Sequence, residues 1–183
     1  NAIYPLMKNS KAIHALFIIG VLVAGLLAGF LNMPGEWYAS LAKPPFNPPD
    51  WLFGPVWTVL YVFIGWAGAR SFLRREEYPR AFGLWVVQFV LNIAWMPVFF
   101  GLHMMVPALI VIVALLLAIL AFIGNTRQHD RLSAALFSPY ALWVAFATLL
   151  NAAAPTLKEV NLEDCGLEAA QAVMAMSQRA PAL

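Results

Sequence analysis

The stretch that decides the fold is MMVPALIVIVALLLAILAFIG, residues 104–124, which contains no charged side chain. A run of this kind is long enough for an α-helix to cross a bilayer, which needs roughly 20 consecutive apolar residues. It is too long for a strand of a membrane β-barrel, and it lacks the alternation of apolar and polar side chains that such strands show. The segment therefore predicts a transmembrane helix.

Four further segments have the same character, at residues 13–31, 53–73, 81–100 and 132–150. The sequence thus predicts an all-α integral membrane protein, a bundle of five transmembrane helices whose partner is the lipid bilayer. Composition agrees, because 11% of the 183 residues are charged, against roughly 25% in soluble domains. The net charge is only +2, so the chain lacks the excess of positive charge that is typical of nucleic-acid-binding proteins.

The spans divide the chain into an N-terminal segment, residues 1–12, a membrane domain, residues 13–153, and a C-terminal tail, residues 154–183. Short joints connect the helices, except for residues 32–52, which hold five prolines. Because prolines at this density exclude a regular helix, we expect a stiff extended loop there. A loop of this length is usually functional. The sequence of the tail assigns it no function.

The lysines and arginines are distributed unevenly across the predicted membrane. Eight lie on the side of the N-terminus and three on the side of the proline-rich loop. By the positive-inside rule the N-terminus is expected in the cytoplasm and the loop outside. Short joints and the lack of a targeting presequence favour a bacterial cell membrane. A dual-topology or mitochondrial protein would not need to follow the charge rule, and this alternative stays open.

The predicted spans carry little of the chemistry that catalysis or ion transport requires. None of Asp, Glu, Lys or Arg lies mid-membrane, which argues against an ion-coupled pump. The three histidines fall at span ends or in loops, so no buried pair is available to bind a haem iron. We therefore expect no metal site, no intrinsic cofactor, and no hydrolytic or redox catalytic centre.

Aromatic and amide side chains recur at helical spacing on three of the spans. They are Trp57 and Tyr61 on the second, Gln88, Asn92, Trp95 and Phe99 on the third, and Tyr140, Trp143 and Ala147 on the fifth. If these faces converge, they line an aromatic pocket with a few hydrogen-bonding groups, as small-molecule sites do. Alternatively, the tryptophans and tyrosines form an interfacial belt and the amides join helices. Periodicity alone leaves both interpretations open.

Glycine and proline positions predict how the helices pack. Gly25 and Gly29 form a GxxxG motif on the first span, which lets helix backbones approach closely and supports a dimer only weakly. Pro97, Pro107 and Pro139 lie inside or near the ends of spans, where they are expected to kink or locally break the helix.

Three ordered motifs lie in three separate segments. They are Trp37-Tyr38 with Lys43-Pro44-Pro45-Phe46-Asn47-Pro48-Pro49, Trp51, Phe53, Pro55 and Trp57; Asn92-Ile93-Ala94-Trp95-Met96-Pro97-Val98-Phe99-Phe100; and Pro139-Tyr140-Ala141-Leu142-Trp143 with Leu150-Asn151. Together, over residues 13–153, they resemble the translocator protein family, also called tryptophan-rich sensory proteins (TspO) or peripheral-type benzodiazepine receptors.

The resemblance implies a five-helix bundle, usually a homodimer, with a pocket beneath the first loop. It implies binding of porphyrins such as protoporphyrin IX, of sterols and of synthetic drugs, in tetrapyrrole sensing, transport or regulation. The resemblance assigns the family's pocket positions to Trp57, Asn92, Trp143 and Ala147, which lie on the aromatic and amide helix faces described above. Two loop-motif residues, Phe46 and Trp51, complete the candidate ligand-binding set; many members have tryptophan at the position of Phe46.

The resemblance leaves other functions open. One is light-dependent degradation of a bound porphyrin, with Trp57 and Trp143 as oxidisable partners. Others are a porphyrin or sterol transporter, and a structural membrane component whose aromatic residues only pack. The family's sterol motif needs a tyrosine near the end of the fifth span, whereas residues 151–155 read Asn-Ala-Ala-Ala-Pro. Binding is favoured, because it requires only shape, stacking and a few hydrogen-bond donors.

Overall fold

The computed structural model describes residues 10–41 and 43–153. Within these ranges it contains five helices long and apolar enough to cross a membrane, which confirms the predicted fold class. They are Ser10–Leu31 (α2), Asp50–Leu73 (α4), Pro79–Gly101, Met105–Thr126 (α6) and Arg131–Ala153. The predicted N-terminal segment for the most part, and the whole C-terminal tail, lie outside the described residues.

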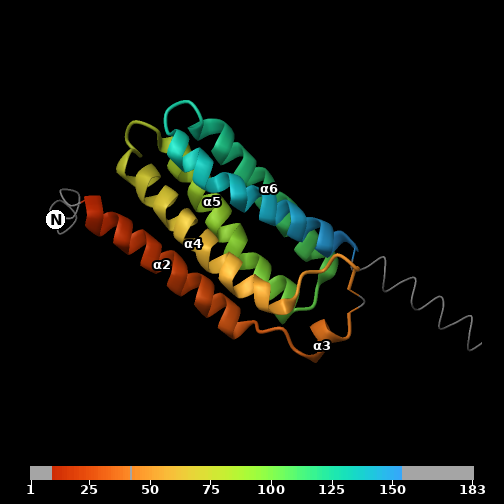
Figure 1. Cartoon of the computed structure of the whole chain (residues 1–183). Coiled ribbons are helices and arrows are strands. Elements are labelled where there is room, and N and C mark those ends of the chain that lie inside the picture. The colour runs from red at the N-terminus through yellow and green to blue at the C-terminus, as the bar shows by residue number, and fades with distance from the viewer. Residues whose placement is uncertain (1–9, 42, 154–183) are drawn as a thin grey trace, which may run out of the picture.

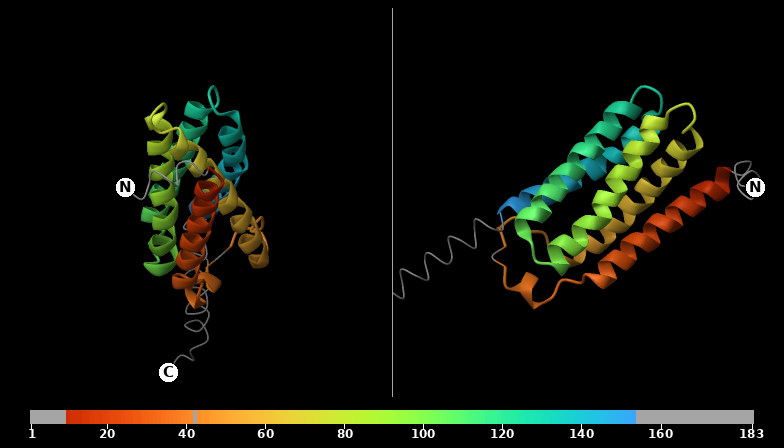
Figure 2. Two further views of the ribbon diagram at one scale, coloured as in Figure 1. Left: turned by 90° about the vertical axis from the view of Figure 1, so that its left-hand side faces the viewer. Right: turned by 180° about the vertical axis from the view of Figure 1, so that it is seen from behind.

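The helices run side by side in one bundle (Figure 1). α2 lies at one edge and packs on α4, while α5, Pro79–Met96, packs on α6. The helix Arg131–Ala153 lies against α6, where the rings of Phe122 and Phe137 are 4.1 Å apart. The loop between α2 and α4 covers one end of the bundle, which we call the loop end (Figure 2). The opposite end carries Arg70, Arg74 and Asp130 and is called the arginine end.

Glycine sets the closest contact between α2 and α4. A Cβ atom added at Gly25 would lie 2.2 Å from the ring of Tyr61, and one added at Gly65 would lie 2.6 Å from the Cα of Ile18. Both spacings are shorter than van der Waals contact, so a larger residue at Gly65 would require the backbone of α2 to move, and one at Gly25 would require the Tyr61 ring to shift. The first glycine of the GxxxG motif is thus used for packing within the chain, as expected from its sequence.

Two of the three prolines named above leave the described helices unbroken, and the third begins a turn of a different kind. Pro97 opens a π-helical turn, η1, Pro97–Gly101, which extends α5 without a gap. The expected break at Pro107 and Pro139 does not occur. Pro107 lies in the first turn of α6, where a backbone N–H has no partner within the helix in any case. The helix Arg131–Ala153 continues through Pro139.

The proline-rich loop is more structured than the sequence predicts. It contains a short helix, α3, Glu36–Ala39, and α4 begins at Asp50, before the predicted end of the loop. The expectation that this segment excludes regular helix was therefore wrong. The reason is that the prolines flank the stretch EWYA and none lies within it, so its backbone N–H groups are free to bond: Ser40 donates to the carbonyl of Glu36 at 2.9 Å.

Candidate ligand-binding chamber

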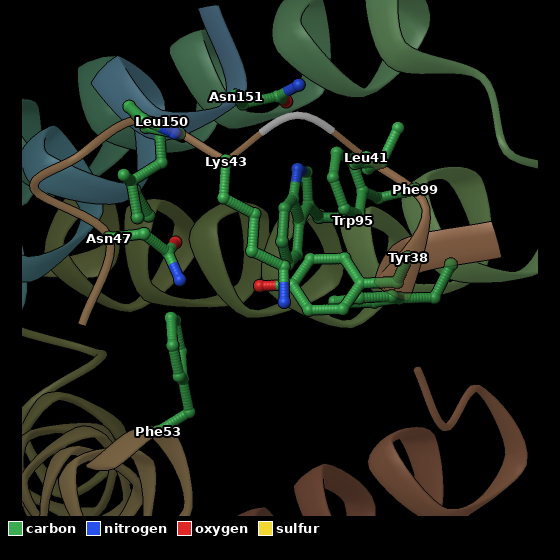
Figure 3. Close-up of a pocket in the computed structure, with 12 residues that line it drawn as sticks. Tyr38, Leu41, Lys43, Asn47, Phe53, Trp95, Phe99, Leu150 and Asn151 are labelled. Carbon is green, nitrogen blue, oxygen red and sulfur yellow. The ribbon is translucent and has the colours of Figure 1, made fainter. Parts of the chain in front are cut away.

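A chamber lies at the loop end, between the loop and the ends of the helices. Two adjoining cavities of about 70 and 400 Å³ form it, and four aromatic residues line both: Tyr38, Phe53, Trp95 and Phe100. The larger cavity falls within the roughly 300–1,000 Å³ of small-molecule pockets. The smaller one lies beneath the loop, which lines it with Tyr38, Leu41, Lys43, Pro44 and Asn47 (Figure 3).

The walls of the chamber are built by the end of the third membrane helix. Trp95 and Phe99 stack with ring centroids 5.0 Å apart, and Phe100 meets Phe99 edge-on at 4.8 Å. The loop helix packs on the same group, since Trp37 lies 5.6 Å from Phe99 and Tyr38 lies 5.4 Å from Phe100. Because η1 is wider than an α-helical turn, the consecutive residues Phe99 and Phe100 both line the chamber.

A few polar groups interrupt these apolar walls. The indole Nε1 of Trp95 and the Oδ1 of Asn151 are buried and have no hydrogen-bond partner among the described residues. The ammonium of Lys43 lies 4.2 Å above the ring of Tyr38 and 3.7 Å from a carboxylate oxygen of Asp50. Figure 3 shows the Lys43 side chain reaching from the loop toward Tyr38, beside Trp95. The chamber therefore offers an unused donor, an unused acceptor, one cation and the carboxylate of Asp50 paired with it.

Tyr38 stays a neutral phenol at physiological pH. Its burial raises the pKa above the ordinary value of 10.0, the nearby Asp50 carboxylate raises it further, and a hydrogen bond with Asn47 lowers it in part. Its ring can therefore stack on a ligand without bringing a negative charge into the chamber.

The structure distributes the predicted site residues over several places. Trp95, Phe99 and Ala147 line the chamber. Trp57 and Tyr61, whose rings lie 5.3 Å apart, line an opening between α2 and α4. Phe46 and Trp51 are 54% and 72% exposed and line none of the cavities found in the described ranges.

Three of the predicted residues form a hydrogen-bonded group in the core instead of a pocket wall. The Nδ2 of Asn92 donates to the hydroxyl of Tyr140 at 2.8 Å, and that hydroxyl donates to the Oε1 of Gln88 at 3.1 Å. All three side chains are buried, and none lines a cavity found in the described ranges. For these residues the geometry matches the alternative interpretation, in which amides join helices.

Trp143 lines a different space. It borders an apolar groove of about 700 Å³ between α4 and the helix Arg131–Ala153. Its ring meets that of Phe53 edge-on at 5.6 Å, and Phe53 lines the chamber. Trp143 thus lies behind the chamber wall, one ring away from the interior.

Sequence reasoning missed several residues that line the chamber. Tyr38, Phe53 and Phe100 all lie within the quoted motifs, so the signal was present in the sequence. Helical spacing did not select Phe100, because a regular α-helix would turn consecutive residues to different faces. Met96, which lines the larger cavity, carries no polar or aromatic signal.

This fold and this chamber define a class: an α-helical integral membrane protein with an aromatic-lined chamber beneath the loop that joins its first two spans. Residues 17–157 match the model of the TspO/MBR family. The chain therefore belongs to the TspO/MBR family, which confirms the resemblance. Membership supports a membrane role in sensing or transport related to tetrapyrroles or sterols.

Similar proteins come from several organisms. Protein CrtK of Rhodobacter capsulatus is 38% identical over 145 residues, which cover 78% of this chain and 90% of that protein. Tryptophan-rich sensory protein of Cereibacter sphaeroides is 37% identical over 139 residues, 75% of this chain and 87% of the relative. Translocator protein of Homo sapiens is 39% identical over 136 residues, 69% of this chain and 79% of the relative.

Proposed function

We propose that this protein binds a porphyrin such as protoporphyrin IX in the chamber beneath the loop, as part of tetrapyrrole sensing, transport or regulation. The observation that carries the proposal is the unpaired indole N–H of Trp95, buried within an aromatic wall. A buried donor without a partner costs about 1–3 kcal/mol, so a ligand acceptor that pairs with it recovers free energy on binding.

The walls suit a flat ligand. Trp95 and Phe99 stack nearly parallel, with an interplanar angle of 16°, and Phe100 stands edge-on to both. Offset stacking and edge-to-face contacts are the geometries that aromatic rings prefer, and a planar macrocycle provides both. Aliphatic residues, Leu41 and Leu150, complete the apolar lining.

The charge at the mouth suits a ligand with a carboxylate edge. Lys43 lines the smaller cavity of the chamber, and its partner Asp50 lines the larger one, with 71% of its side chain accessible. An exposed ion pair at 3.7 Å is worth only about 0–1 kcal/mol. Lys43 can therefore exchange Asp50 for a carboxylate of the ligand at little cost.

The orientation and assembly belong to the same proposal. The arginines of the arginine end favour a cytoplasmic location for that end and an external location for the loop end. On this basis we propose that the chamber opens on the outer side of a bacterial cell membrane. The homodimer stays a prediction of the family resemblance.

The test is a titration of protein in lipid nanodiscs with protoporphyrin IX, followed in the dark by quenching of tryptophan fluorescence. Replacing Trp95 with phenylalanine keeps a ring and removes the donor, so we expect affinity to fall about 2- to 10-fold, the value of one hydrogen bond. Trp51→Phe is the matched control, because Trp51 is exposed and borders no cavity in the described ranges. Equal losses in both variants, or no saturable quenching in the wild type, would contradict the chamber assignment.

A second arm tests the cation. Lys43→Met should weaken binding of protoporphyrin IX and leave binding of its dimethyl ester unchanged, because the ester has no carboxylate to pair. An equal effect on both ligands would contradict the pairing with Lys43. Loss of porphyrin absorbance in light, beyond that of empty nanodiscs, would extend the proposal to photodegradation.

A further inference from the structure

An opening between α2 and α4 adjoins the chamber. It has a volume of about 270 Å³ and shares Gly29, Met33 and Met96 with the larger chamber cavity. Trp57 and Tyr61, which sequence reasoning assigned to the pocket itself, line this opening and neither chamber cavity. Two of the predicted ligand-binding residues therefore line the opening beside the chamber and not the chamber itself.

The opening faces the bilayer. Its lining comes from three membrane-spanning helices and includes no charged side chain. Leu26 and Phe30 border it and are 64% and 70% exposed, and at this position in a span the exposed side chains contact lipid. By contrast, the chamber's other boundary, at the loop, carries the charged pair Lys43 and Asp50.

Missing side chains keep the opening free. A Cβ atom added at Gly54 would meet no atom within 4 Å, and one added at Gly29 would meet only the methyl group of Met96, at 3.8 Å. Two methionine side chains, Met33 and Met96, line both the opening and the chamber, and Met96 is the one that lies against Gly29. A methionine is unbranched and changes rotamer readily, so it can move aside for a ligand.

We propose that hydrophobic ligands reach the chamber laterally from the bilayer, through the opening between α2 and α4, with Met96 as a movable plug. This inference rests on the proposed function, because it requires a ligand that occupies the chamber. It adds the source of that ligand: an apolar, flat molecule dissolved in the lipid, which passes over the Trp57 and Tyr61 rings without crossing the loop. The second glycine of the GxxxG motif then serves access and not only packing.

The experiment measures rates of protoporphyrin IX binding in nanodiscs by stopped-flow quenching of tryptophan fluorescence. Gly29→Leu places a branched side chain in the junction. We expect both association and dissociation to slow about tenfold, while the dissociation constant changes much less, as expected when only the path is obstructed. Gly20→Leu is the matched control, since it makes the same change on the same helix where a Cβ atom meets nothing within 4 Å.

Met96 supplies a second pair of variants that do not crowd α2. Met96→Ala should accelerate both rates and Met96→Phe should slow them, and thermal unfolding verifies that each variant is folded. Association should also fall as lipid is added at fixed porphyrin, because the ligand is diluted within the lipid phase.

The outcomes separate the two proposals. Rates unchanged by Gly29→Leu and by both Met96 variants, with binding intact, would overturn the lateral route and leave the chamber assignment standing. Slowing by Lys43→Met instead of by Gly29→Leu would place access at the loop and equally overturn it. Absence of saturable binding in the wild type would overturn the proposed function itself.

Discussion

The two ends of the bundle differ in the charge and the space that they hold. At the arginine end, Asp130 accepts hydrogen bonds from Arg70 at 2.8–3.1 Å and from the hydroxyl of Ser133 at 2.6 Å. Buried polar atoms without a partner in the described ranges occur at both ends: Asn125 Oδ1 and His129 Nε2 at the arginine end, and Trp95 Nε1 and Asn151 Oδ1 at the loop end. The cavities differ, at about 10 Å³ beside Asp130 and about 400 Å³ beneath the loop. One end is closely packed around an ion pair, whereas at the other end the unpaired groups of Trp95 and Asn151 lie beside open space.

The arginine end joins the two helices that carry opposite sides of the chamber. Asp130 precedes the helix Arg131–Ala153 and caps it, since the backbone N–H of Ser133 donates to Oδ1 at 3.3 Å. Arg70 belongs to α4, and Arg74, the residue that follows this helix, donates to the carbonyl of His129 at 2.7 Å.

Among the tests of this difference between the two ends, Asp130→Asn is expected to cause the largest loss of stability. The change leaves Arg70 without its counter-charge and weakens the cap. The pair is only partly buried, since 32% of the Arg70 side chain is exposed, but Arg70 makes three of its hydrogen bonds, and hydrogen bonds to charged groups contribute about 1.5–3 kcal/mol each. Thermal unfolding in detergent should show a clear loss of stability, while the folded fraction binds protoporphyrin IX with wild-type affinity. Reduced affinity in the folded fraction would show that the two ends are not independent.

The pH dependence of stability gives an independent check of the same pair. Burial raises the pKa of Asp130, but hydrogen bonds from Arg70 and Ser133 outweigh it and hold that pKa below the ordinary 3.8. A depressed pKa contributes stability that is present above pH 3.8 and is lost as the pH falls through the folded-state value. Wild-type stability should therefore decline below about pH 4, and Asp130→Asn should flatten this decline.

An intermediate effect is expected from Gly25→Ala. The added methyl group would overlap the ring of Tyr61, and overpacking of this kind costs about 1–3 kcal/mol. Gly20→Ala is the control, because its Cβ atom meets nothing and alanine favours the helix. A thermal unfolding experiment in which both variants match the wild type would contradict the close contact between α2 and α4.

The smallest effect is expected from Tyr140→Phe, which removes the hydroxyl shared by Asn92 and Gln88. Hydrogen bonds between helices in membranes are worth about 0.6 kcal/mol each, so stability should fall by about 1 kcal/mol. Because these residues border no cavity in the described ranges, porphyrin affinity should stay unchanged. A loss of porphyrin affinity as large as that of Trp95→Phe would show that the buried group of Asn92, Tyr140 and Gln88 contributes to ligand binding.

Much of the fold could be predicted from the sequence, because a bilayer imposes a strict length and composition on each span. Predicted and observed spans agree to within a few residues at each end; the helix predicted at 104–124, for example, is Met105–Thr126. Trp95, Phe99 and Ala147 were predicted as pocket residues and line the chamber. Spacing on a helix predicts a shared face, but it does not predict what that face meets.

By itself, the sequence determined the five spans, the long proline-rich loop and the family, because each depends on runs and motifs along the chain. Only the tertiary structure decided what the aromatic and amide faces of these helices contact. Asn92 and Gln88 pair with Tyr140 in a closed core, while the π-helical turn after Pro97 directs both Phe99 and Phe100 toward the loop. The physical reason is that a cavity is the space between helices, so its location depends on how separate faces dock and not on the periodicity of any one of them.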